Sequence, residues 1–102
     1  MLRFERECRT PYSEVYTILD DEQPQGRFDV HFSGNLIHAT LCVSERYTTD
    51  EIRDMIGDLD DEVLDAIGLD REDFIVHVHQ GRDIGVFSNN QYTEELPPAP
   101  EN

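Results

Sequence analysis

The sequence predicts an α+β domain in which an antiparallel sheet of four to five strands carries one helix on one face. Three observations predict it: an alternating hairpin pattern around Gly34-Asn35, a capped amphipathic helix after Thr48, and a β-branched segment at residues 74–79. A helix packed on the apolar face of a sheet is one of the few stable layer arrangements. The expected order is β-β-β-α-β-β, within one domain of residues 1–88.

The first third of the chain contains two candidate strands. Weak alternation over residues 1–9 favours an edge strand or an ordered arm. Residues 14–19 are β-branched and aromatic, which favours a strand. A helix is the alternative for this segment, because Thr10 and Pro11 are typical of an N-cap and a first helical residue. Residues 20–26 are expected to form a loop.

Residues 27–33 and 36–43 form the clearest unit, a β-hairpin around Gly34-Asn35. Glycine in the first position of a two-residue loop is typical of a type II′ turn. Pairing outward from this turn sets Phe32 opposite Ile37. One face is then wholly apolar, which favours this register because a slip of one residue would reverse both faces. The apolar face consists of Phe28, Val30, Phe32, Ile37, Ala39, Leu41 and Val43.

A helix is expected to follow the hairpin. Thr48 and Glu51 have the spacing of a capping box, in which each side chain bonds the other residue's backbone N–H. Gly57 and Asp58 predict a kink or a division into two short helices, and Gly68 is a natural end. An apolar stripe at helical spacing predicts the buried face. It consists of Ile52, Met55, Ile56, Leu59, Val63 and Ile67.

Two further strands are expected at residues 74–79 and 84–87, joined by a loop at residues 81–83. A three-residue loop would place the apolar side chains of the last strand on the apolar face of the sheet. A loop of two or four residues would instead turn them toward the histidine face. Residues 89–102 are polar and proline-rich, which predicts a disordered tail with polyproline II character.

Charge and composition exclude several classes of function. The chain has 23 acidic and eight basic residues, a formal charge of −15, and every basic residue is Arg. Direct binding to nucleic acid is not expected, because neutralising phosphates requires clustered cations. Without Lys, neither a Walker-type phosphate loop nor a Schiff base can form. The expected partner is therefore a protein with a basic surface, or a second copy of the chain.

The four histidines are the first candidate site. His31 and His38 are opposite each other in the predicted hairpin, with Cβ atoms roughly 4.5–5.5 Å apart. His77 and His79 share one face of a later strand, and Cys42 lies on the histidine side of the hairpin. Zinc takes nitrogen and sulfur ligands in tetrahedral sites, so convergence of these side chains would make a metal site. No cofactor is otherwise expected.

The polar face of the predicted helix is the second candidate site. Its carboxylates could bind a basic surface on a partner. We interpret the chain as a small interaction module, either a regulatory, inhibitory or assembly subunit, rather than an enzyme; a metal-binding or metal-dependent enzyme domain is the alternative. The proposed partner-binding residues on this face are Asp54, Asp58, Asp61, Glu62 and Asp65.

With no signal peptide and no run of ~18 apolar residues, a cytoplasmic protein without membrane association is expected.

Overall fold

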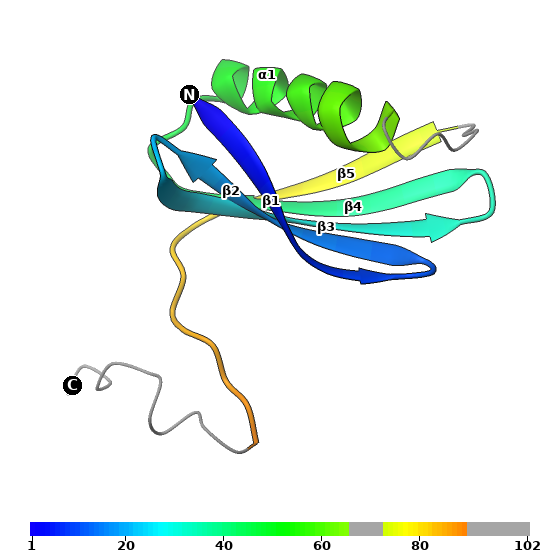
Figure 1. Cartoon of the computed structure of the whole chain (residues 1–102). Coiled ribbons are helices and arrows are strands. Elements are labelled where there is room, and N and C mark those ends of the chain that lie inside the picture. The colour runs from blue at the N-terminus through cyan, green and yellow to red at the C-terminus, as the bar shows by residue number, and fades with distance from the viewer. Residues whose placement is uncertain (66–72, 90–102) are drawn as a thin grey trace.

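The computed structural model describes residues 1–65 and 73–89. Within these residues five strands form one sheet in the order β1-β2-β3-β4-β5, and helix α1 crosses one face of it (Figure 1). The strands are β1 (Leu2–Thr10), β2 (Ser13–Asp20), β3 (Gln23–Ser33), β4 (Leu36–Val43) and β5 (Asp73–Gln80), and α1 spans Thr49–Leu59. The small α+β fold with one helix is confirmed.

Strands β1 to β4 form an antiparallel meander with short turns. β1 is the edge strand, as expected for the first residues. The alternative of a helix after Thr10 is wrong: Thr10 pairs with Ser13 across a turn at Pro11-Tyr12, and β2 follows. Proline at this position favours a turn as readily as a helix start, since its fixed φ suits both.

The expected loop at residues 20–26 is also wrong. Asp20 pairs with Gln23, so the connection between β2 and β3 is a two-residue turn. Asp21 and Glu22 both have positive φ, 50° and 66°, as a type I′ turn requires. β3 then continues through Pro24, next to an irregularity in the pairing that accommodates a residue without an N–H.

The central hairpin has the predicted register. Phe32 pairs with Ile37 and His31 with His38, and the alternation continues along both strands. Gly34 has a φ of 61°, as the first residue of a type II′ turn requires. Turn chemistry and alternation act over a few residues, so local sequence determines this unit.

Helix α1 begins as predicted. Thr48 accepts a hydrogen bond from the backbone N–H of Glu51, whose own side chain accepts one from the N–H of Thr48. Gly57 and Asp58 lie inside the α-helix, and the hydrogen-bond pattern changes only afterwards, to a π-helical turn at Asp60–Leu64. Ile67 and Gly68, the expected end of the helix, lie outside the described residues.

Strand β5 contradicts an all-antiparallel sheet. It runs parallel to β4, with Leu36 opposite Asp73 and Val43 opposite Gln80. The expected order β-β-β-α-β-β is likewise wrong, because four strands precede the helix and one follows it. The physical reason is the crossover: the chain leaves the end of β4, passes through α1 and returns to the level at which β4 began.

The strand expected at residues 84–87 is absent from the described part of the chain. Residues 81–88 have no regular secondary structure and run away from the sheet (Figure 1). The predicted hairpin with β5 through residues 81–83 is therefore wrong. Of the expected tail, residues 90–102 lie outside the described residues.

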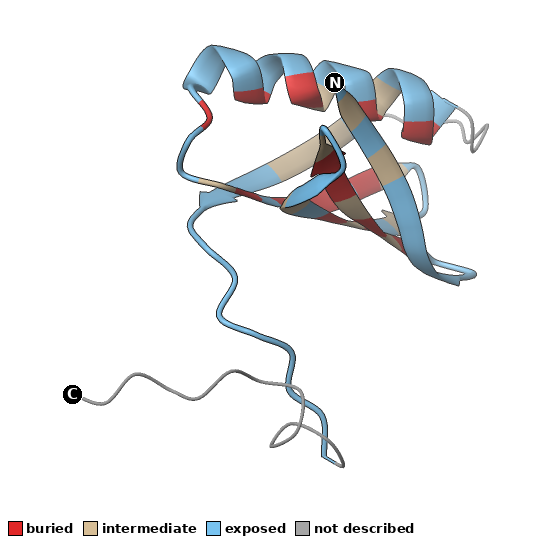
Figure 2. Ribbon diagram, turned by 60° about the vertical axis from the view of Figure 1, so that its left-hand side comes forward, coloured by how far each residue is buried: buried red, intermediate tan, exposed pale blue. Residues whose placement is uncertain are grey.

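The core lies between α1 and the sheet. Figure 2 shows the buried residues of α1 on the side that faces the strands. Phe28 and Leu41 are fully buried at the centre of the sheet, and Met55 and Leu59 pack onto the same cluster from the helix. Burial of this apolar area is the main force that holds the helix to the sheet.

Candidate functional site

The sheet has a second face, turned away from α1, and the histidines lie on it. His31 pairs with His38 across β3 and β4, while His77 is opposite Thr40 and His79 opposite Cys42 across β4 and β5. All four imidazoles are exposed. Alternation along the strands therefore brings them to one face, as zinc binding would require.

Sharing a face does not make a metal centre. The His31–His38 pair lies near the Gly34 turn, whereas His79 lies at the opposite end of β4, beside Cys42. Within residues 1–65 and 73–89, no group of three or more His, Cys, Asp or Glu side chains is arranged to hold a metal ion. The register thus separates the ligands that a tetrahedral zinc site would need to bring together.

The carboxylates expected to bind a partner are exposed along α1 and the π-helical turn. They are Asp54, Asp58, Asp61, Glu62 and Asp65. Neither helical segment has a basic residue in its last turn. Arg53 is the only basic residue between positions 49 and 65, and its guanidinium lies 3.7 Å from the carboxylate of Asp50. This surface therefore carries a strongly negative charge.

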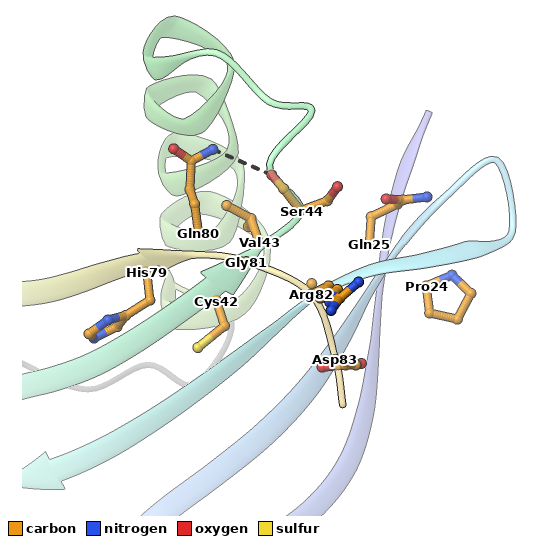
Figure 3. Close-up of a pocket in the computed structure, with 11 residues that line it drawn as sticks. Pro24, Gln25, Cys42, Val43, Ser44, His79, Gln80, Gly81, Arg82 and Asp83 are labelled. Carbon is orange, nitrogen blue, oxygen red and sulfur yellow. Dashed lines mark hydrogen bonds between the residues drawn. The ribbon is translucent and has the colours of Figure 1, made fainter. Parts of the chain in front are cut away.

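A pocket of about 440 Å³ opens where β4 and β5 end (Figure 3). Sequence reasoning missed it, because it depends on the parallel pairing of these strands. One wall is held in place by Gln80, whose amide donates to the carbonyl of Tyr47 at 2.9 Å. The pocket is lined by Pro24, Gln25, Gly26, Cys42, Val43, Ser44, His79, Gln80, Gly81, Arg82 and Asp83.

The chemistry available in the pocket is limited. Cys42 and His79 are neighbours across the two strands, and Arg82 adds a positive charge, but all three side chains are exposed. Of the lining residues only Val43 is buried. Small-molecule sites usually bury most of the ligand against apolar walls. This pocket therefore has weaker features of a ligand site than its size suggests.

A buried carboxylate is the second feature that sequence reasoning missed. Glu14 is 2% exposed and accepts a hydrogen bond of 2.5 Å from the hydroxyl of Tyr16. The Arg9 side chain approaches the same carboxylate at 3.4 Å, and Arg6 lies at 4.0 Å. Burial, followed by the hydrogen bond to Glu14, raises the pKa of Tyr16 to about 12. A buried charge needs such partners, so this cluster has a structural explanation.

A further polar cluster joins the loop before α1 to the end of β2. Asp20 accepts hydrogen bonds from the hydroxyl of Tyr47 at 2.8 Å, from the guanidinium of Arg46 and from the amino group of Met1. The Tyr47 hydroxyl, and next the amino group, lower the pKa of the Asp20 carboxyl. The Arg46 guanidinium also lies 4.8 Å from the centre of the Tyr47 ring. These contacts hold the loop between β4 and α1 against the end of β2.

Comparisons with known proteins give no relative: no protein-family model, no curated protein and no solved structure matches this chain. Among the described residues, no helix has both the length and the apolar character needed to cross a membrane.

Proposed function

We propose that this protein is a small interaction module that binds a basic surface on a partner protein through the outer side of α1 and the π-helical turn. The observation that carries the proposal is the distribution of charge on this segment. Asp58, Asp61 and Glu62 are exposed on this segment, and between residues 49 and 65 the one basic residue in the sequence is Arg53.

Repulsion between neighbouring carboxylates on this segment favours a partner of opposite charge. Like charges four residues apart on a helix repel, by roughly 0.2–0.5 kcal/mol a pair, and Asp54 and Asp58 have this spacing within α1. A basic partner would remove this repulsion on binding. Complementary charge of this kind speeds association and favours partners of opposite charge.

Charge reversal gives a direct test. In the variant Asp58→Arg, Asp61→Arg, Glu62→Arg, only exposed side chains change, so the stability of the free domain should stay close to that of wild type. Binding to a basic partner should nevertheless be lost. The matched control, Glu7→Arg, Glu45→Arg, Asp83→Arg, makes the same change in net charge at three exposed residues outside the helix.

The measurement is capture of proteins from a native lysate on the immobilised chain, with identification by mass spectrometry at low and high salt. We expect basic proteins to be retained at low salt, released as the Debye length falls below about 8 Å, and retained by the control but not by the helix variant. Retention that is unaffected by both salt and the helix variant would contradict the proposal.

A further inference from the structure

Strand β5 is an edge of the sheet, and half of its backbone groups point outward. The N–H of Gly81 donates to the carbonyl of Val43 at 3.0 Å, which sets the direction of the backbone at the end of β5. Backbone groups alternate in direction along a strand, so the N–H and C=O groups of Val76 and Val78 point away from β4. In the described part of the chain, no strand follows β5 in the sheet.

The two edges of the sheet differ in chemistry. The β1 edge carries charged side chains at most positions, and its pairing is interrupted between Arg6 and Cys8. Charges and bulges are the features by which proteins protect edge strands from pairing with another chain. β5 has no charged residue between Phe74 and Gln80 and no interruption in its register. As far as residues 1–65 and 73–89 show, the β5 edge is therefore open to strand addition.

The apolar face of the sheet is also incomplete at this edge. Val76 is opposite Ala39 and Val78 opposite Leu41, so both valines lie on the face that α1 covers. Leu41 is fully buried, but Val78 remains 39% exposed. A further strand beside β5 could cover this apolar surface.

The chain itself contains a segment suited to that position. Ile84, Val86 and Phe87 are 81%, 71% and 66% exposed in the stretch that leaves the end of β5 (Figure 1). Isolated exposed apolar residues are common, but three within four positions of a β-branched and aromatic sequence are typical of a strand. In a strand, Ile84 and Val86 would share one face.

We propose that residues 84–87 pair with the β5 edge of a second copy of this chain, and that the second copy returns the same contact, to form a two-fold symmetric dimer. The occupant is inferred to be a second copy because one chain carries both halves of the contact: an open edge and an exposed strand-like segment. Exchange of an identical element between protomers is a simple route to such a dimer, with residues 81–83 as the connection. Ile84 and Val86 of one copy would cover Val76 and Val78 of the other.

This dimer is independent of the proposed binding to a basic partner, and the two have opposite salt dependence. Two copies with a formal charge of −15 each repel, so added salt should strengthen self-association. Binding of a basic partner to the acidic helix should weaken under the same conditions. The failure of one proposal can therefore be distinguished from the failure of the other.

Sedimentation equilibrium of the full chain over a range of concentrations and salt tests the dimer. We expect a reversible dimer that tightens with salt. The uncharged double variant Ile84→Ser, Val86→Ser should weaken self-association by at least about tenfold, the factor that corresponds to the loss of a modest apolar contact. Tyr12→Ser, which removes an exposed aromatic side chain from the opposite edge of the sheet, should leave the dimer unchanged.

A second variant tests the edge itself. Val78→Pro removes an N–H that points away from β4, and proline is tolerated at such positions of edge strands, so the domain should fold and the dimer should be lost. If Val78→Pro does not fold, the double variant Ile84→Ser, Val86→Ser still tests the dimer, because both substitutions lie outside the described helices and strands. A chain that stays monomeric at every concentration would overturn the proposal. A dimer that resists the double variant would overturn it as well.

Discussion

The hydroxyl of Tyr16 donates a hydrogen bond of 2.5 Å to the carboxylate of Glu14, two residues earlier on the same face of β2. Both residues lie on the side of the sheet that α1 covers, and Arg9 and Arg6 approach the carboxylate from β1. The pair joins the charged edge strand to the apolar core. Its energetic contribution can be measured.

Tyr16→Phe should lower the free energy of unfolding at neutral pH by about 1–3 kcal/mol, because a buried carboxylate loses a hydrogen-bond donor. Tyr12→Phe, at an exposed tyrosine, is the matched control and should leave stability unchanged. Urea unfolding followed by circular dichroism measures both. Equal stability of Tyr16→Phe and wild type would show that water or the arginines replace the hydroxyl at no cost.

Alkaline pH should affect the same pair. The pKa of Tyr16 is raised from 10.0 to about 12 in the folded protein, by burial and by the hydrogen bond to Glu14. Between these values the unfolded chain binds fewer protons than the folded chain, so stability falls as pH rises through this range. Tyr16→Phe should show a smaller fall. The absence of Lys leaves few other groups that titrate in this window.

Asp20 should have the opposite dependence on pH. Its pKa is lowered, first by the hydrogen bond from Tyr47, so its contribution to stability is present above the ordinary aspartate pKa and is lost as pH falls through the lowered value. Asp20→Asn should therefore lower the melting temperature at neutral pH, and the difference from wild type should shrink below about pH 4. Asp61→Asn is the control. A difference that persists in strong acid would contradict this role.

Local sequence predicted the elements whose determinants lie within a few residues. The hairpin around Gly34 follows from one turn and one alternation, and the helix start follows from Thr48 and Glu51. By contrast, the direction of β5 is not encoded in β5, because it depends on the crossover through α1. The rule that a strand–helix–strand crossover gives parallel pairing could have predicted it.

The buried side of β2 was ambiguous in the sequence for a physical reason. One face of the strand carries Glu14, Tyr16 and Ile18, and the other carries Val15 and Leu19, so both have apolar side chains. The structure buries the face with the carboxylate, because partners from β1 satisfy its charge. Those partners are set by pairing between strands, which alternation within one strand does not reveal.

The candidate sites also differ in whether local sequence or pairing between strands determines them. Alternation places the four histidines on one face, but the distance between the two pairs depends on the register of β4 and β5, a long-range property. The same register creates the pocket at Cys42 and His79. The exposed carboxylates of α1, in contrast, follow directly from helical periodicity and agree with their exposure in the structure.

Leu41→Ala should cost ~2–5 kcal/mol of stability, because Leu41 is fully buried between the sheet and α1 and its truncation leaves a cavity. Leu41 lies in the core cluster, and part-buried Ile56 packs against that cluster. Asp61→Ala, at an exposed position, should change stability by no more than about 0.5 kcal/mol. Similar losses from both in urea would show that the faces of the helix or the sheet are misassigned.

Two glycine-to-alanine substitutions should change stability in opposite directions. A Cβ at Gly26 would lie 2.7 Å from the carbonyl oxygen of Cys42, a backbone atom that cannot move cheaply, whereas a Cβ at Gly57 meets nothing within 4 Å. Gly26→Ala should therefore destabilise the domain by about 1–3 kcal/mol, as overpacking does. Gly57→Ala should stabilise it by roughly 0.5–1 kcal/mol, because Gly57 is exposed inside α1 and alanine loses less backbone entropy in a helix. The midpoints of urea unfolding measure both effects when the m-value, the slope of the unfolding free energy against urea concentration, is unchanged. If Gly26→Ala is neutral, β3 and β4 do not approach closely at this point; if Gly57→Ala is destabilising, residue 57 does not lie in a regular, exposed helix.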